Sequence, residues 1–132
     1  MNATAMLPDT LTVVGDRDVR AMPAGPHAAE GRLDAQMFLV SEADNENTVM
    51  KAHYGAGVWS RWHSHPLGQI LYVLSGVCRV QREGGGVFLA QPGDVVWLAP
   101  DEIHRHGADE GGPMSYLSIQ GVREGVYARW AA

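Results

Sequence analysis

The sequence has little of what marks several large classes of protein. Its one cysteine, Cys78, cannot form an intrachain disulfide, so a reducing compartment is expected. Apolar runs such as 70–74 are far too short to span a bilayer, and residues 1–14 lack the basic start and long apolar segment of a secretory signal. Lys and Arg form no basic stripe and the net charge is -5, which argues against nucleic acid and anionic membranes as partners. We therefore expect a cytoplasmic protein.

What the sequence does contain fits one β-rich domain. Its 132 residues are 45% hydrophobic and 19% charged, which is ordinary for a single globular domain. No stretch has a sustained helical period, and 16 Gly and 7 Pro separate short segments of aliphatic and aromatic residues. The predicted strands are 36–41, 48–55, 59–65, 69–74, 77–81, 86–90, 94–98, 103–106 and 114–120. Many short, evenly spaced strands predict an all-β sandwich or barrel.

The ends of the chain differ from this pattern. Residues 1–36 are richer in Pro, Ala and Gly, and within them only 11–14 is strand-like. We interpret this segment as an extended N-terminal arm that lies over the β-domain or over a partner subunit. The β-domain is then 37–122, and 123–132 is a C-terminal tail. His27, in the arm, receives no role.

Two His-x-His pairs suggest a metal site. Residues two apart in a strand share a face, so His63 and His65 point the same way, as do His104 and His106. Imidazole nitrogen suits Mn, Fe, Ni, Cu and Zn. The alternative is that these are ordinary polar histidines on exposed strand faces. Two such pairs in one strand-rich chain favour the metal site.

The spacing around these pairs resembles the two motifs of the cupin family. In the first, Gly57, five residues, His63-x-His65, three residues, Gln69, six residues and Gly76 follow one another, with Gln where most members carry Glu. In the second, Gly93 is followed after five residues by 99–104, APDEIH, which ends on a third histidine. This match departs from the family at Ala99 and Asp101, where Pro and Gly are usual, and at Ala108, where Asn often stands.

The cupin resemblance implies both a fold and a ligand set. The expected fold is a jelly-roll β-barrel, also called a double-stranded β-helix. In its mouth, one divalent transition metal would be held by His63, His65, Gln69 and His104. Manganese ranks first, followed by iron, nickel or zinc.

A closer resemblance is to small bacterial cupins that act as manganese-dependent (R)-selective hydroxynitrile lyases. The matching segments are WHSHPLGQ at 62–69, QREGG at 81–85, PGDVVWLAP at 92–100, HRHGA at 104–108 and LSIQ at 117–120. The resemblance implies a substrate pocket lined by Met50, Ala52, His106, Tyr116 and Gln120. His106 is the candidate acid–base group, because an unperturbed imidazole titrates near pH 6.5. Gln120 is expected to orient a substrate oxygen.

The ligand set favours one kind of chemistry. Three neutral imidazoles and a neutral amide leave the +2 charge of the ion uncompensated, which suits Lewis-acid work and disfavours oxygen activation. Cleavage or synthesis of a cyanohydrin is the most specific function of this kind, with the metal holding the substrate oxygen or cyanide while His106 moves the proton. One alternative is a non-haem iron dioxygenase. Another is a cupin that binds a small molecule, or regulates, without catalysis.

The strand at 114–120 bears on assembly. An apolar pattern alone would turn Leu117 and Ile119 inward, whereas the resemblance turns Gln120 inward. We follow the resemblance, because a jelly roll buries both faces when subunits pair. The Leu117 and Ile119 face and the arm therefore predict a homodimer or homotetramer. His53 has the opposite parity to the pocket residues and is expected to face away, and Trp59, Trp62 and Trp97 are assigned to the core or an interface.

Overall fold

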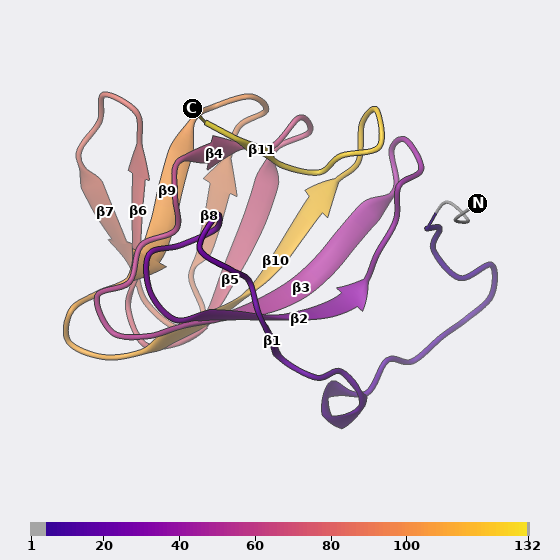
Figure 1. The fold of residues 1–132 in the computed structure, drawn as a ribbon, viewed down its shortest axis with the longest axis horizontal. Coiled ribbons are helices and arrows are strands. Elements are labelled where there is room, and N and C mark those ends of the chain that lie inside the picture. Colours follow the sequence, from indigo (N-terminus) through magenta and orange to yellow (C-terminus); the bar gives the residue numbers. More distant parts are fainter. Residues whose placement is uncertain (1–4, 132) are drawn as a thin grey trace.

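Two antiparallel sheets face each other in the computed structural model, which describes residues 5–131 (Figure 1). The larger sheet has six strands in the order β1 (Met22–Pro23), β2 (Leu33–Leu39), β3 (Asn47–Tyr54), β10 (Met114–Gly121), β5 (Gln69–Ser75) and β8 (Val95–Leu98). The smaller has five, in the order β11 (Arg129–Trp130), β4 (His63–Ser64), β9 (His104–Ala108), β6 (Cys78–Arg82) and β7 (Val87–Ala90). Strands distant in sequence are neighbours in both sheets. The all-β jelly-roll prediction is confirmed.

Several predicted strands differ from those observed. The segment 11–14 is not a strand, because its Leu11 and Val13 side chains are exposed and its backbone pairs with neither sheet. The segment 59–65 contains only isolated bridges at Trp59 and Ser60 and the two-residue β4. The short strands β1 and β11 were not predicted. Within residues 5–131 there is no α-helix, only the 3-10 helix η1 (Asp16–Asp18).

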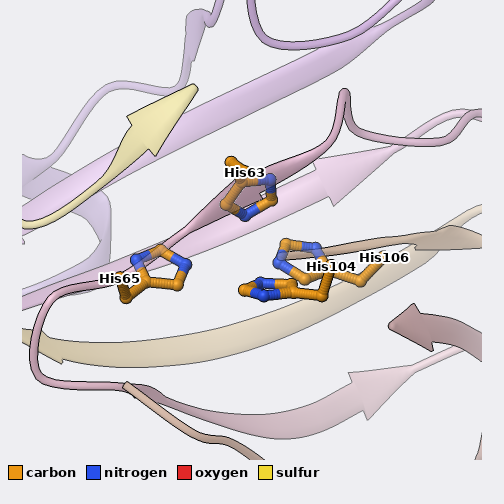
Figure 2. Close-up of side chains that lie close together, drawn as sticks. All are labelled: His63, His65, His104 and His106. Carbon is orange, nitrogen blue, oxygen red and sulfur yellow. The ribbon is translucent and has the colours of Figure 1, made fainter. Parts of the chain in front are cut away.

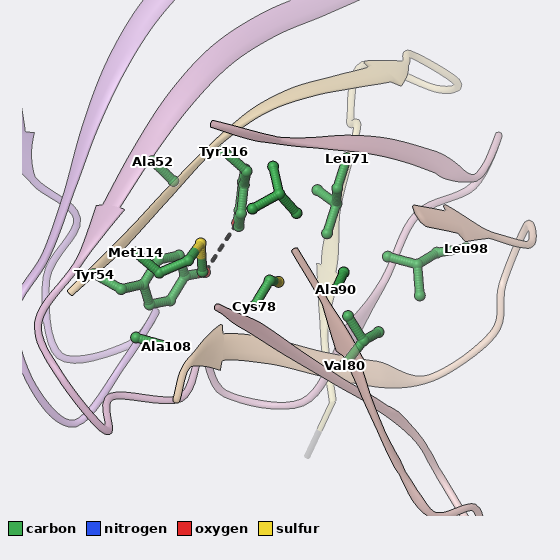
Figure 3. Packing of buried hydrophobic residues seen from close by; sticks show 11 residues of the cluster. Ala52, Tyr54, Leu71, Cys78, Val80, Ala90, Leu98, Ala108, Met114 and Tyr116 are labelled. Carbon is green, nitrogen blue, oxygen red and sulfur yellow. Dashed lines mark hydrogen bonds between the residues drawn. The ribbon is translucent and has the colours of Figure 1, made fainter. Parts of the chain in front are cut away.

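Alternation along the strands sorts side chains between the core and the surface. In β5, Gln69, Leu71 and Val73 are buried, while the residues between them are exposed. In β10, Tyr116 and Gln120 are buried, so this strand turns the face that the family resemblance implied toward the space between the sheets. The core cluster fills that space (Figure 3) and consists of Ala52, Tyr54, Leu71, Val73, Cys78, Val80, Ala90, Leu98, Ala108, Met114 and Tyr116.

Two glycines fix the ends of β5. Gly68 has φ +81°, and a Cβ there would lie 2.7 Å from the carbonyl oxygen of Leu98. Gly76 has φ +72°, and a Cβ there would lie 2.1 Å from the carbonyl oxygen of Pro113. Only glycine combines positive φ with such close backbone approach at low cost. These two turns set the register that places Gln69 between the sheets.

Both ends of the chain contact the barrel. The Gln36 side chain donates a hydrogen bond to the Val19 carbonyl (2.9 Å), and the Arg61 amide donates to the Ala28 carbonyl (2.8 Å). The larger sheet begins at β1, and β2 starts at Leu33, so both strands start within the range that the sequence assigned to the arm. The C-terminal β11 pairs with β4 and lies beside it in Figure 1. Across residues 5–131, no helix is long and apolar enough to cross a membrane.

Candidate metal centre

Four histidines converge between the sheets (Figure 2). His63 lies in β4, His65 follows that strand directly, and His104 and His106 lie in β9, where His104 pairs with His63. One ring nitrogen of each lies within 4.8 Å of those of the others. All four side chains are at most 3% exposed. The group could hold a divalent metal ion. Which of the four histidines could bind the ion depends on which ring nitrogens keep a lone pair that points into the cluster.

Three of the histidines have the same backbone anchor. The Nδ1 atoms of His63, His65 and His104 lie 2.7, 2.8 and 2.8 Å from the carbonyl oxygens of residues 61, 127 and 102. A carbonyl only accepts, so each Nδ1 carries the proton and each Nε2 keeps its lone pair. Metal-binding histidines are commonly oriented in this way, through the nitrogen that does not bind the metal.

The electrostatics of these histidines suit a metal. Burial, with the neighbouring histidines, lowers the pKa of His63 to about 3, and burial chiefly lowers that of His65 to about 4. Burial also lowers the pKa of His104. The rings are therefore neutral near pH 7. The Nε2 atoms of His65 and His104 are buried without any hydrogen-bond partner among residues 5–131, which is costly unless an ion satisfies them. The donor set fits a divalent transition metal.

His106 has a different environment. Its Nδ1 lies 3.1 Å from the hydroxyls of both Tyr54 and Tyr116, which lie 2.9 Å from each other. Its Nε2 lies 3.1 Å from Oε1 of Gln69. Complete burial and the neighbouring histidines hold its pKa well below the usual range. The sequence-based expectation of a group titrating near pH 6.5 therefore needs correction, since His106 is a neutral imidazole at neutral pH.

A chain of amides continues from His106. The Gln69 Nε2 group donates to Oε1 of Gln120 at 2.9 Å, and the Gln120 amide donates to the Thr48 hydroxyl. This leaves Oε1 of Gln69 as the acceptor that faces the histidines. Gln120 contacts Gln69 directly, so its clearest role in the structure is to orient that amide.

A cavity of about 250 Å³ opens beside the histidines. All five residues that the resemblance assigned to a pocket line it, namely Met50, Ala52, His106, Tyr116 and Gln120. His63, His65 and Gln69 also reach it. An apolar cavity of about 150 Å³ is enough for benzene. The space therefore suits a small organic molecule.

Other lining residues were not identified from the sequence. Tyr54 shares strand parity with Met50 and Ala52, a signal that extending the predicted pocket along β3 would have found. His27, which received no role, also lines the cavity, as do Tyr127 and Trp130 from the tail. Nothing in the sequence links these distant segments to the histidines.

His53 and the other three tryptophans lie away from the cavity. His53 points elsewhere, with its Nε2 2.7 Å from Oε1 of Gln36. The Arg105 guanidinium lies over the rings of Trp59 and Trp62, at 4.0 and 4.9 Å from their centroids. Trp97 is 59% exposed, so it is not a core residue of the single chain.

Comparisons with known proteins agree with this geometry. The family model described as AraC-like ligand binding domain matches residues 52–124, more than half of the chain. A stretch of 74 residues is 47% identical to an (R)-mandelonitrile lyase of Granulicella tundricola, covering 56% of this chain and 56% of that protein. The chain thus spans about half the length of this relative.

Solved structures share the fold. A cupin-like protein of Thermotoga maritima has a TM-score of 0.76 at 26% identity, covering 94% of this chain and 90% of that one. The polyketide cyclase RemF of Streptomyces resistomycificus has a TM-score of 0.72 at 17% identity, covering 93% and 87%, a likeness in fold alone. The jelly roll is thus a cupin barrel, and proteins similar to it include enzymes. The chain belongs to the family of AraC-like ligand binding domains.

Proposed function

We propose that this protein is a metal-dependent lyase that cleaves or forms cyanohydrins, as a hydroxynitrile lyase does. The observation that carries the proposal is that the four buried histidines have two different kinds of hydrogen-bond partner. Three present Nε2 lone pairs held in place by backbone carbonyls, and the fourth, His106, is held by hydroxyls and an amide. The identity to an (R)-mandelonitrile lyase over 74 residues supports the same reading.

The proposed ligand set is His63, His65, His104 and Oε1 of Gln69. Manganese is the first choice of ion, followed by iron, nickel or zinc, because the resemblance to manganese-dependent members extends over the residues that supply the ligands. A bound divalent ion would supply Lewis acidity toward a substrate oxygen or cyanide. The backbone anchors would hold the three rings in place, and Gln120 would hold the Gln69 amide through its 2.9 Å hydrogen bond.

His106 would carry the proton. Cleavage of a cyanohydrin breaks the bond between the carbinol carbon and cyanide, and the hydroxyl proton must reach the departing cyanide. In the structure Nε2 of His106 faces Oε1 of Gln69, which only accepts, so the imidazole carries its proton on Nε2. The phenols beside Nδ1 can donate or accept, so a shift of this proton to Nδ1, with Oε1 of Gln69 turned to the metal, would free the Nε2 lone pair for the substrate. Nε2 would then take the hydroxyl proton. Because burial opposes a lasting charge on His106, it would pass the proton on readily to cyanide.

The cavity supports a small substrate with an apolar substituent. Met50 and Ala52 line one side of it, and Tyr116 lies close to His106. Its volume of about 250 Å³ suits an aldehyde or cyanohydrin with one ring. Binding the apolar part against these side chains would leave the reacting oxygen beside the histidines.

An anaerobic assay tests the proposal. Protein loaded with Mn(II) should release aldehyde and cyanide from mandelonitrile at the same rate with and without dioxygen, because no step changes the oxidation state of the metal. Protein stripped of metal by chelation should lose this activity. Turnover that needs dioxygen and consumes it with product would instead indicate a non-haem iron dioxygenase.

A second candidate is binding of a small molecule without catalysis. The observation in its favour is the match of residues 52–124 to a family described by ligand binding. In that case the same cavity would bind a small acid, sugar or similar ligand, and no cyanohydrin would react. Calorimetric titration of the metal-loaded protein with such ligands, alongside the mandelonitrile assay, separates the two functions.

A further inference from the structure

The C-terminal segment 127–130, here called the strap, is built into the wall of the metal centre. The Tyr127 carbonyl accepts the hydrogen bond from Nδ1 of His65 at 2.8 Å. In β11, Trp130 pairs with His63, and the following Ala131 amide donates to the Trp62 carbonyl at 3.0 Å. The strap therefore contacts two of the three backbone-held histidines. It lies beyond residues 52–124, which the family model matches.

The strap also supplies an aromatic side chain at the same place. The Trp130 ring centroid lies 5.1 Å from that of His63 and 5.7 Å from that of His27, whose ring is nearly perpendicular to the Trp130 ring. Tyr127 and Trp130 both line the cavity. Trp130 is 46% exposed, so it closes the cavity on one side while its other side meets solvent.

Among residues 5–131, few other polar contacts hold the strap in place. Strand β11 has two residues, and the Arg129 guanidinium makes only exposed ion pairs with Asp101 (3.7 Å) and Glu124 (3.9 Å). Exposed pairs of this kind contribute little to stability. The contacts with His63 and His65 are thus a large part of what docks the strap.

We propose that the strap is a positioning element of the metal centre and that its docking is coupled to metal binding. The inference rests on the proposed metal-dependent function. An ion that fixes the rings of His63 and His65 also fixes the partners of Trp130 and of the Tyr127 carbonyl. Linkage is reciprocal, so a docked strap must raise metal affinity by the factor by which metal favours docking. Trp130 and Tyr127 act here through the histidines.

Trp130→Ala removes the side-chain anchor and leaves the four histidines in place. We expect its affinity for Mn(II), measured by competition with a chelator, to fall about 10- to 100-fold, the usual effect of losing a group that orients a metal ligand. Trp130→Phe keeps a ring against His63 and should restore most of the affinity. Phe88→Ala, an aromatic deletion at a 72% exposed position of β7, is the control and should bind Mn(II) as the unaltered protein does.

Amide hydrogen exchange tests the coupling directly, because a strap that only stabilised the fold would exchange at the same rate with and without metal. In the unaltered protein, Mn(II) should slow exchange in the peptide that contains 127–131, and this slowing should be smaller in Trp130→Ala. If Mn(II) slows exchange equally in Trp130→Ala and in the unaltered protein, and the two bind Mn(II) with equal affinity, the coupling is overturned and the proposed metal function stays intact. If the unaltered protein binds no metal, the proposed function and the coupling are both overturned.

Discussion

The two halves of the histidine cluster differ in what their Nδ1 atoms contact. His63, His65 and His104 each face a backbone carbonyl, a group that can only accept a hydrogen bond. His106 faces two phenol hydroxyls, which can donate or accept. The carbonyls place the proton of the first three rings on Nδ1. His106 carries its proton on Nε2 instead, because Oε1 of Gln69 only accepts, and its Nδ1 lone pair faces the phenols. The same residue type, in one cluster and at similar burial, thus holds opposite tautomers in the two halves.

This difference explains why position alone does not assign roles here. His104 and His106 lie two residues apart on the same face of β9, with ring centroids 5.3 Å apart. One has a buried Nε2 without a partner, and the other has its Nε2 3.1 Å from Oε1 of Gln69. The proposed roles, a metal ligand for His104 and a proton carrier for His106, therefore rest on the contacts of each ring and not on its position in the strand.

Removing a backbone-held histidine should have the largest effect. We expect His104→Ala to lose most of its bound metal and all metal-dependent turnover of mandelonitrile, because one of three convergent Nε2 donors is gone. Metal content by mass spectrometry and the cyanide assay check this. His53→Ala, which removes a histidine outside the cavity, should keep both metal and activity. Full metal content in His104→Ala would contradict the assignment.

Removing His106 should separate metal binding from catalysis. His106→Ala should retain about one metal ion per chain but turn over mandelonitrile roughly 10²- to 10⁴-fold more slowly, the usual effect of losing a general acid–base group. Turnover is measured at equal metal loading. Loss of metal in step with activity would mean that His106 is a fourth imidazole ligand.

The phenols beside His106 should have a smaller effect. Tyr54→Phe removes a hydroxyl 3.1 Å from Nδ1 of His106 and 2.9 Å from the Tyr116 hydroxyl. The Tyr116 hydroxyl remains, so we expect kcat to fall about fivefold, as for a net loss of about 1 kcal/mol from one hydrogen bond. Tyr72→Phe, on the outer face of β5, is the matched control. Unchanged kcat in Tyr54→Phe would show that the hydroxyl pair does not assist His106.

Acid should destabilise the metal-free protein through these histidines. The unfolded chain binds protons below about pH 6.5, whereas folded His63 and His65 do so only below pKa values of about 3 and 4. Between these limits the unfolded state holds more protons, so the free energy of unfolding falls as the pH falls. Each histidine contributes about 1.4 kcal/mol per pH unit well below pH 6.5. Urea denaturation at pH 7.5 and 5.0 checks this, and equal stabilities would contradict the burial argument.

Assembly should affect the site least, because both halves of the histidine cluster belong to one chain. The outer face of the larger sheet exposes paired apolar residues, Ile70 opposite Trp97 and Tyr72 opposite Val95. We propose that a second copy covers this face, giving a homodimer or a tetramer built from it. Tyr72→Glu should yield monomers by light scattering while keeping its metal. A monomeric unaltered protein would contradict this.

The strand pattern predicted an all-β sandwich or barrel, and the resemblance of two motifs to the cupin family narrowed this to a jelly roll with a histidine site in its mouth. Strand alternation and two motifs were enough to bring His63, His65, His104 and His106 together. The prediction was weaker where burial changes chemistry, as at His106, whose pKa is lowered first by burial and then by the neighbouring histidines.

The ends of the chain could not be predicted in the same way. The segment 11–14 has a strand-like composition but no neighbouring strand to pair with, and 129–130 forms a strand only because β4 offers an edge. Trp130 reaches the cavity through this pairing, 67 positions along the chain from its partner His63. Such contacts depend on tertiary geometry, and no periodicity in the sequence reports them.

A crystal structure of the protein loaded with Mn(II) or Zn(II) tests the central claim most directly. We predict an ion bound by Nε2 of His63, His65 and His104, at about 2.0–2.1 Å for zinc, with Oε1 of Gln69 as the amide ligand. In the metal-loaded structure, Nδ1 of His106 should remain beside the two phenols, and its Nε2 should not bind the metal. An ion bound by all four imidazoles, or one bound elsewhere, would contradict the account.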